Sequence, residues 1–277
     1  MARLAYLGPV GTFSEEAALR YEPSAELLPF STEAAVVAAV ESGEADVGVL
    51  AIENSIEGSV TRTLDALIHD SQLSIRHELI LPIEHCLIVR PGMTAADIHV
   101  VRSHPQALNQ CRKFLERCFP QARQEASLSN AAAVEEILAM EDAAAIGPAR
   151  AAELRGAQIL SRGIQDDAHN KTRFVVLGRT DGEPSGDDKT SIAFTVAHDR
   201  PGTLVDVLHE FADREINLTN IESRPSREEL GIYIFLVDLE GHRSEPNVAE
   251  ALAAVQAKTF FFRVLGSYPR SHDARDP

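Results

Sequence analysis

Four polar loops hold the residues of this chain whose types could do chemistry, and each follows or enters an apolar run typical of a strand. They are residues 8–14 (GPVGTFS), 52–59 (IENSIEGS), 102–111 (RSHPQALNQC) and 166–174 (DDAHNKTRF). Functional loops of an α/β sheet lie beyond the carboxyl ends of its strands. We therefore expect these loops to share one crevice.

The first loop is a candidate anion site that needs no Lys or Arg. Thr12 and Ser14 lead into an expected helix, whose free N–H groups and dipole attract negative charge. The alternative is a plain connector between a strand and a helix, and the loop taken alone favours that alternative. The Gly-Lys-Ser/Thr of a phosphate-binding P-loop is missing.

The other three loops offer mainly neutral hydrogen-bonding groups. Asn54 could orient a substrate oxygen, because an amide has donors and an acceptor, although an Asx-type turn explains it equally well. His104 is expected to cap a helix or lie buried, since no second His or Cys stands at metal-ligand spacing. Strand alternation points Thr172 and Phe174 one way and Arg173 the other, although an exposed strand entry would also fit.

Short apolar runs alternate with helical patterns as far as residue 178. This alternation predicts an α/β architecture with largely parallel sheets. The expected strands are Leu4–Leu7, Ala45–Ile52, Ile98–Arg102, Ala143–Ile146 and Phe174–Gly178, with extended chain over Leu73–Val89. The expected helices are Ser14–Tyr21, Thr32–Glu41 with Thr32 as its cap, one ending near Asp70, Gln106–Cys118, Asn130–Met140 and Pro148–Leu154.

A second, smaller module follows the polar, acidic stretch Arg179–Lys189, which is typical of a solvated linker. Its pattern is β-α-β-β-α-β, the ferredoxin-like topology. The expected elements are strand Thr190–Ala197, helix Pro201–Arg214, strands Ile216–Ser223 and Gly231–Leu239, helix Glu245–Ala257 and strand Phe260–Leu265.

Composition narrows the classes of function. The 277 residues suggest about two domains. A formal net charge of -16 argues against non-specific binding to nucleic acid or a membrane surface, and no apolar run approaches the roughly 20 residues of a membrane span. Cys86, Cys111 and Cys118 form no C-x-x-C pair, so small buried thiols in a reducing cytoplasm are expected rather than disulfides or zinc.

In this order, the loops resemble the signature stretches of the prephenate dehydratase family: GPVGTFSEEA, AIENSIEGSV, SHPQALNQC and NKTRFVVLGR. The C-terminal module resembles an ACT domain through DRPGTLVDVL and INLTNIESRP. The similarity covers roughly Leu4 to Tyr268. It implies a catalytic domain over 1–180 with two lobes similar to a type II periplasmic binding protein (lobe one about 1–76 and 160–180, lobe two about 77–159). A linker over 181–189 and an ACT domain over 190–270 follow.

The resemblance implies a carbon–oxygen lyase that converts prephenate to phenylpyruvate with loss of carbon dioxide and water, in L-phenylalanine biosynthesis. It implies no metal and no organic cofactor, because formation of an aromatic ring drives the reaction. Thr172 would ease the departure of the ring hydroxyl. The implied catalytic residues are Thr172, Asn54, Gln110 and Ser103. The implied substrate-binding residues are Thr12, Phe13, Ser14, Ser55, Arg173 and Phe174.

The ACT resemblance implies feedback control by phenylalanine, bound where two such modules pair side by side. We expect phenylalanine to lower activity and to promote association of a homodimer into a homotetramer, with no nucleic-acid or membrane partner and a cytoplasmic location. Thr203 stands where the related stretch usually has alanine. The implied phenylalanine-binding residues are Gly202, Thr203, Leu204, Val205, Asn217, Leu218, Glu222, Ser223, Arg224 and Pro225. The alternatives are an arogenate dehydratase and a non-catalytic amino-acid sensor.

Overall fold

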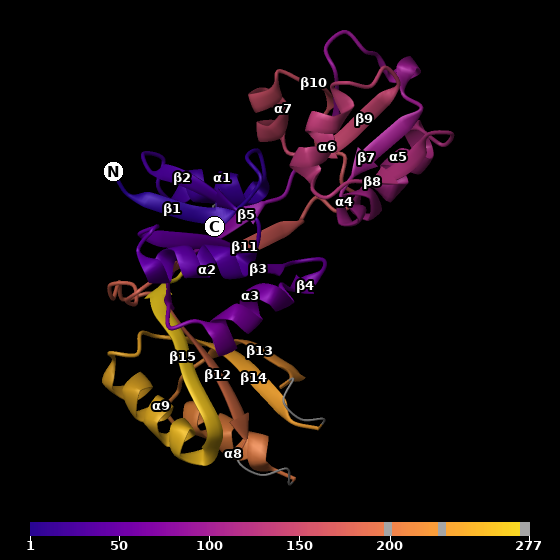
Figure 1. Ribbon diagram of the computed structural model, residues 1–277. Coiled ribbons are helices and arrows are strands. Elements are labelled where there is room, and N and C mark those ends of the chain that lie inside the picture. Colours follow the sequence, from indigo (N-terminus) through magenta and orange to yellow (C-terminus); the bar gives the residue numbers. More distant parts are fainter. Residues whose placement is uncertain (197–200, 227–230, 272–277) are drawn as a thin grey trace. The chain divides into compact units, whose positions relative to one another are not determined.

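The structure is a computed structural model that describes residues 1–196, 201–226 and 231–271 (Figure 1). Its described residues form three sheets. The chain divides into two compact units, each built from several segments. The first unit comprises Met1–Val36, Val49–Val60 and Ile80–Phe174, and the second comprises Val37–Gly48, Thr61–Leu79 and Val175–Pro277.

The first sheet has the strand order β2-β1-β3-β11-β5, with β4 paired to β3. Its central strand β3 reads VGVLAIEN, and the apolar run is buried as expected for the middle of a sheet. The strands are β1 (Arg3–Leu7), β2 (Glu26–Phe30), β3 (Val47–Asn54), β4 (Gly58–Ser59), β5 (Ser74–Pro82) and β11 (Lys171–Gly178). The helices along the same part of the chain are α1 (Phe13–Tyr21), α2 (Glu33–Ser42), α3 (Thr61–Asp65) and the π-helical turn η1 (Ala66–Asp70).

Side-chain caps fix where the first helices start. The Thr12 hydroxyl accepts the Glu15 N–H at the start of α1, 3.3 Å away. The Thr32 hydroxyl accepts the Ala35 N–H at 3.1 Å at the start of α2, so the predicted Thr32 cap is confirmed. Each hydroxyl satisfies one of the N–H groups that a helix leaves without a partner in its first turn.

The second sheet has the order β10-β6-β9-β7-β8. It is mixed rather than largely parallel, because β7 runs parallel to β8 and β9 whereas β6 runs antiparallel to β9 and β10. Its strands are β6 (Cys86–Val89), β7 (Val100–Ser103), β8 (Arg123–Ala126), β9 (Ala143–Gly147) and β10 (Gln158–Ser161). The helices are η2 (Ala95–Asp97), α4 (Pro105–Gln110), α5 (Arg112–Cys118), α6 (Asn130–Ile137) and α7 (Ala149–Arg155).

Alternation along these strands builds one core on each face of the second sheet. Leu87 and Val89 of β6 pack in a cluster with α4 and α5, while Cys86 and Ile88 pack in another with α6 and α7. The sheet is therefore the middle of three layers. The chain enters it between β5 and β6 and returns to the first sheet between β10 and β11.

Two sequence predictions in this region need correction. The helix expected over Gln106–Cys118 is interrupted at Cys111, whose φ and ψ of -111° and 16° are not helical. Cys118 is exposed, whereas Cys86 and Cys111 are buried free thiols as expected. Burial raises the pKa of Cys86 to about 11 and that of Cys111 to about 12.

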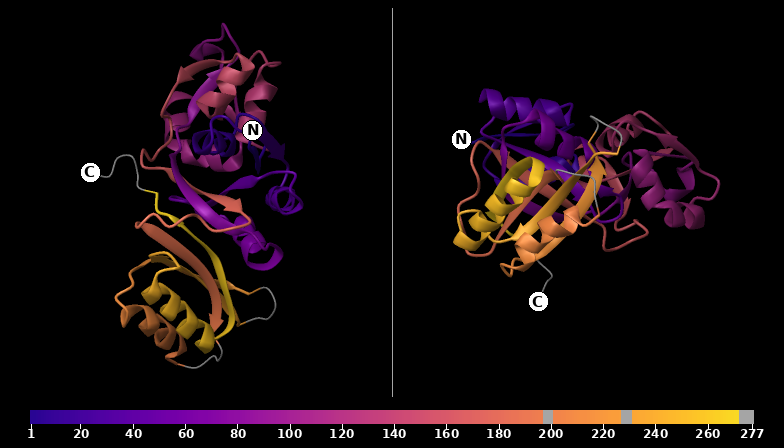
Figure 2. Two further views of the ribbon diagram at one scale, coloured as in Figure 1. Left: turned by 90° about the vertical axis from the view of Figure 1, so that its left-hand side faces the viewer. Right: turned by 90° about the horizontal axis from the view of Figure 1, so that it is seen from below.

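The third sheet, with the order β13-β14-β12-β15, confirms the β-α-β-β-α-β prediction. Helices α8 and α9 cover one of its faces (Figure 2). Phe194 and Phe211 are buried in one core cluster with residues of both helices. Its elements are β12 (Asp188–Val196), α8 (Thr203–Ala212), β13 (Leu218–Pro225), β14 (Tyr233–Glu240), α9 (Pro246–Lys258) and β15 (Thr259–Pro269). Within the described ranges, no helix has the length and apolar character to cross a membrane.

Candidate active site

A cavity of about 200 Å³ in the first unit is lined by residues from all four polar loops. Its wall consists of Phe13, Ser14, Ala51, Asn54, Val60, Ile83, His85, His104, Gln106, Ala107, Gln110, Asn130, Thr172 and Phe174. The expectation that these loops share one crevice is confirmed. The turn from β3, the entry of β11 and the helices α1 and α4 each bring a loop to the cavity.

Asn54 and Thr172 meet in this wall. The Asn54 side chain is fixed by its own turn, because Oδ1 accepts the N–H groups of Ile56 and Glu57, both at 3.1 Å. Nδ2 therefore faces the other way and donates to Thr172 Oγ1 at 2.9 Å. Since this contact occupies a lone pair of the Thr172 oxygen and not its proton, the Thr172 hydroxyl can still donate a hydrogen bond to a ligand.

Gln110 lies in the same wall and is held by two donors. Asn170 Nδ2 and His85 Nε2 each lie 3.0 Å from Gln110 Oε1. Because an amide oxygen only accepts, His85 carries its proton on Nε2. Burial lowers the pKa of His85, and the Gln110 hydrogen bond opposes this shift, so the ring is neutral near pH 7.

The cavity wall carries no side chain of formal charge among the described residues that form it, since it contains no Lys, Arg, Asp or Glu. It does contain Phe13 and Ser14, the first two residues of α1, and Asn130, the first residue of α6. A helix N-terminus carries roughly half a positive charge and unpaired N–H groups. The wall can therefore attract an anion although the chain as a whole is acidic.

Three predicted site residues lie behind or beside the wall. Ser103 is fully buried, and its hydroxyl is 2.6 Å from the Ile146 carbonyl oxygen and 3.1 Å from Asn130 Oδ1. Thr12 caps α1. Ser55 is exposed and joins β3 to β11, because its Oγ accepts the Lys171 N–H at 3.0 Å.

Arg173 points away from the cavity, as strand alternation predicts. Thr172 and Phe174 line the wall, whereas the Arg173 guanidinium lies 3.7 Å from a carboxylate oxygen of Glu53. Its side chain is only 12% exposed. Arg173 is therefore placed to hold β11 against β3, and the structure does not bring it to the cavity.

His85 and Asn170 are wall or network residues that the sequence predictions did not single out. His85 stands directly before the buried strand β6, where a polar residue between Glu84 and an apolar run is a weak signal at most. His104, expected as a cap or a buried ring, does cap α4, and its Nδ1 accepts the Gln106 N–H at 3.4 Å. The described residues hold no group of three or more His, Cys, Asp or Glu that suits a metal ion.

The ten predicted phenylalanine-binding residues all lie in the described part of the third-sheet module. Gly202 precedes α8 with a φ of 91°, where glycine is favoured. Most of the others lie on β13, which is an edge strand. Arg224 forms an ion pair with Asp65 of α3, and both side chains are only about a tenth exposed.

One predicted residue of β13, Leu218, lies at the end of the sheet away from the start of α8. Leu218 pairs with Leu239, and Leu239 pairs with Thr190 near the start of β12. Helix α8 begins beyond the other end of β12, which is Val196. One copy of the module therefore keeps Leu218 apart from Gly202, whereas residues 222–225 lie toward the α8 end, since Ser223 pairs with Phe235 and Phe235 with Phe194.

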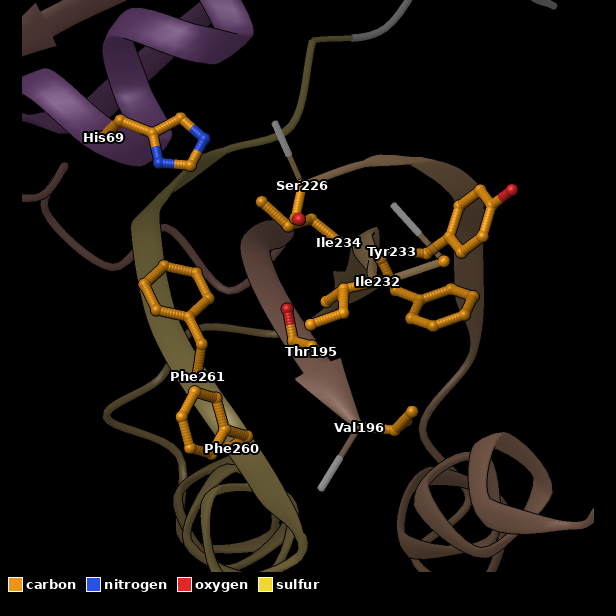
Figure 3. Close-up of a pocket in the computed structure, with 11 residues that line it drawn as sticks. His69, Thr195, Val196, Ser226, Ile232, Tyr233, Ile234, Phe260 and Phe261 are labelled. Atoms are coloured by element: carbon orange, nitrogen blue, oxygen red, sulfur yellow. The ribbon is translucent and has the colours of Figure 1, made fainter. Parts of the chain in front are cut away.

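A larger cavity of about 590 Å³ lies in the second unit (Figure 3). Its wall is mostly apolar and aromatic, with Tyr233, Phe260 and Phe261 prominent in the view. None of the predicted phenylalanine-binding residues lines it. An apolar wall of this kind does not suit a small dicarboxylate.

Comparisons with known proteins agree over almost the whole chain. Residues 4–182 match the family described as prephenate dehydratase, and residues 190–257 match the ACT domain. The prephenate dehydratase of Mycolicibacterium vanbaalenii is 40% identical over 287 residues, which cover 97% of this chain and 91% of that protein.

Two solved structures show the same fold. Prephenate dehydratase from Arthrobacter aurescens, in complex with L-Phe, has a TM-score of 0.89 and 36% identity, covering 97% of this chain and 90% of its own. A protein described as a novel type of quorum quenching acylase has a TM-score of 0.87 and 32% identity, covering 97% and 98%. The family match and the relative that aligns over almost the whole chain show that the chain belongs to the prephenate dehydratase family of lyases and carries a C-terminal ACT domain.

Proposed function

We propose that this enzyme converts prephenate to phenylpyruvate in the cavity around Asn54, Gln110 and Thr172, as a step of L-phenylalanine biosynthesis. The bond from the ring to its carboxylate breaks and releases carbon dioxide. The electron pair moves through the ring and expels the ring hydroxyl at the opposite carbon. The product ring is aromatic, so the main task of the site is to help a poor leaving group depart.

The observation that carries this proposal is the hydrogen bond from Asn54 to the Thr172 oxygen, at 2.9 Å. It orients a neutral hydroxyl whose proton remains available inside the cavity wall. A donor fixed before the reaction needs no reorganisation when negative charge develops on the departing oxygen. We assign Thr172 as that donor and Asn54 as the residue that orients it.

We expect the substrate carboxylates to bind at two helix N-termini. The N–H groups at Phe13 and Ser14 of α1, and the start of α6 at Asn130, contribute positive potential to a wall with no formal charge. Gln110 Nε2 offers one further N–H donor, since its other N–H donates to Glu57 Oε1 at 3.5 Å. In this proposal, Thr12 and Ser103 hold α1 and Asn130 in place, Ser55 and Arg173 brace β3 against β11, and Phe174 excludes water.

The same wall favours prephenate over its aminated analogue arogenate. Arogenate carries an ammonium group, which is best bound by a carboxylate, and the described wall contains none. The preoriented Thr172 hydroxyl likewise supports catalysis over a sensor without activity. The likeness to a quorum quenching acylase makes amide hydrolysis a third outcome to test.

One experiment separates these outcomes. The purified full chain is incubated in parallel with prephenate, with arogenate and with an acylated amine, and phenylpyruvate, phenylalanine and free amine are measured. We expect phenylpyruvate from prephenate at a rate that saturates with substrate. Turnover of arogenate alone, hydrolysis of the amide alone, or no turnover of any of the three would contradict the proposal.

We further propose that phenylalanine binds between the ACT modules of two copies and lowers the rate. The separation of Leu218 and Gly202 along the sheet supports this, since an antiparallel pairing of two β13 edges would bring one copy's α8 loop to the other's β13. The Arg224–Asp65 ion pair supports an effect of phenylalanine on the cavity around Asn54, because Asp65 belongs to α3, which directly follows the 54–60 loop. Unchanged rate and mass in a phenylalanine titration would contradict it.

The domain limits given by the resemblance remain our proposal: a catalytic domain over 1–180 with lobes at about 1–76 plus 160–180 and at about 77–159, a linker over 181–189 and the ACT domain over 190–270. The free buried thiols of Cys86 and Cys111 support a cytoplasmic location. Limited proteolysis tests these limits, since first cleavage inside 190–270 rather than at the linker would contradict them.

A further inference from the structure

A chain of three side-chain amides runs through the wall of the substrate cavity. It begins at Asn54, passes through Asn170 and ends at Gln110. Asn54 Nδ2 donates to Asn170 Oδ1 at 2.9 Å, and Asn170 Nδ2 donates to Gln110 Oε1 at 3.0 Å. Asn170 is 1% exposed, and Asn54 and Gln110 are 8% and 7% exposed. The order of donors and acceptors is therefore set by the protein and not by solvent.

The direction of this chain is fixed at its start by the backbone. The N–H groups of Ile56 and Glu57 both point at Asn54 Oδ1, so Asn54 must present its amino group to Asn170. Asn170 must then present its oxygen to Asn54 and its amino group to Gln110. Gln110 must in turn present its oxygen to Asn170. Its Nε2 is then at the far end, where one N–H donates to Glu57 Oε1 at 3.5 Å and the other stays available.

The direction matters because Gln110 lines the cavity. With the observed order, Gln110 offers the ligand its second N–H donor, which suits a carboxylate or a departing hydroxyl. With the opposite order it would offer a carbonyl oxygen, which repels an anion. His85 supports the observed order, since its Nε2–H also donates to Gln110 Oε1 at 3.0 Å.

We propose that Asn170 is a positioning residue, which passes the amide orientation of Asn54 on to Gln110 and so keeps the amino group of Gln110, with its one available N–H, on the substrate side. This inference rests on the proposed dehydration of prephenate. Asn170 itself is not among the residues that line the cavity, so it acts through Gln110 and Asn54 rather than by touching substrate.

The sharpest test replaces Asn170 with an isosteric residue that loses its hydrogen-bond donor when the pH is raised and the side chain ionises. In Asn170→Asp, a protonated carboxyl accepts from Asn54 and donates to Gln110, as the amide does. The ionised carboxylate cannot donate. The side-chain amide of Gln110 is therefore expected to flip, so that its amino group faces the new carboxylate and His85. Burial raises the pKa of a carboxyl group, which brings the change toward neutral pH.

Among the described residues, the titratable side chains that hydrogen-bond to these amides are His85 and Glu57, whose Oε1 accepts from Gln110 Nε2 at 3.5 Å. Both are also present in the wild type, so each rate of Asn170→Asp is divided by the wild-type rate at the same pH. We expect this ratio of kcat/KM to rise at least about 10-fold from about pH 8 to about pH 5.5. A ratio that stays constant or falls would overturn the proposal.

A second readout does not depend on turnover. The ring nitrogens of His85 report the Gln110 orientation, because Nε2 must donate to an oxygen but accept from an amino group. We expect ¹⁵N NMR to show the Nε2–H form in the wild type, and the Nδ1–H form in Asn170→Asp at the higher pH only. The Nε2–H form under all conditions would overturn the inference, even if prephenate proves not to be the substrate.

A double-variant cycle separates positioning from simple loss of structure. Asn170→Leu and Gln110→Leu are each expected to lower kcat/KM about 10- to 100-fold. If Asn170 acts through Gln110, the double variant falls within about 3-fold of the worse single variant. Losses that multiply in the double variant would show an independent, structural role. Prephenate turnover by the wild type is the control that tests the proposed function itself.

Discussion

Replacing Thr172 with valine removes the proposed donor and little else. Valine has the shape of threonine with a methyl group in place of the hydroxyl, and residue 172 is only 8% exposed. Asn54 Nδ2 loses one acceptor but still has Asn170 Oδ1 at 2.9 Å and the Lys171 carbonyl at 3.2 Å. Its two hydrogens therefore keep two partners. We expect the free energy of unfolding to change by no more than about 1 kcal/mol, because no buried donor is orphaned.

The effect on turnover follows from the same geometry. Loss of one preoriented donor to a developing oxyanion costs about 10²- to 10³-fold in kcat, or about 2.7–4 kcal/mol. The substrate carboxylates are assigned to the helix N-termini and Gln110, which this change leaves in place. KM should therefore stay within about 3-fold of the wild type, since the lost contact strengthens only in the transition state.

The assay is the initial rate of phenylpyruvate formation over a range of prephenate concentrations, with thermal unfolding of the same samples. Thr172→Ser is the matched control, because it keeps the hydroxyl and loses only a methyl group, and it should retain most of the wild-type kcat. A Thr172→Val enzyme with wild-type kcat, or one altered only in KM, would refute the assignment.

Three further predictions concern regulation, pH and stability. Asp65→Asn should leave the rate without phenylalanine unchanged but weaken inhibition in a phenylalanine titration, because it removes the charge paired with Arg224; full inhibition would contradict this. Burial lowers the pKa of His77 and His85, so the unfolded chain binds more protons, and the free energy of unfolding in urea should fall as pH drops below about 6.5; an increase would contradict it. Phe211→Ala, at a ring 1% exposed, should lower the free energy of unfolding of the ACT module by about 3–5 kcal/mol; a loss below about 1 kcal/mol would show a loosely packed core.

Local patterns were enough to predict much of this structure. The amphipathic helices and alternating strands of the third-sheet module depend on neighbours a few residues apart, so its topology could be predicted from the sequence. The same holds for Thr172 and Arg173, whose opposite directions follow from the period of a strand. The convergence of the four loops could be predicted because each one follows or enters a strand.

The network around the cavity could not be predicted in this way. His85, Gln110 and Asn170 are far apart in the sequence, and no spacing rule links them. Residue type alone also fails to show what a hydroxyl bonds to, as Ser103 illustrates with its contact to the Ile146 carbonyl. The break at Cys111 depends on backbone angles. Strand β8 (RQEA) has almost no apolar character, β2 (ELLPF) contains a proline that weakens a strand signal, and β10 (QILS) is only four residues long.

The most direct test of the central claim is a crystal structure of this enzyme with a saturated-ring analogue of prephenate, which keeps the ring hydroxyl and both carboxylates but cannot become aromatic. The account predicts that Thr172 Oγ1 lies about 2.5–3.0 Å from the ring hydroxyl oxygen, with the carboxylates at the N-terminal ends of α1 and α6. A ring hydroxyl held by other groups, with Thr172 Oγ1 more than about 4 Å away, would contradict it.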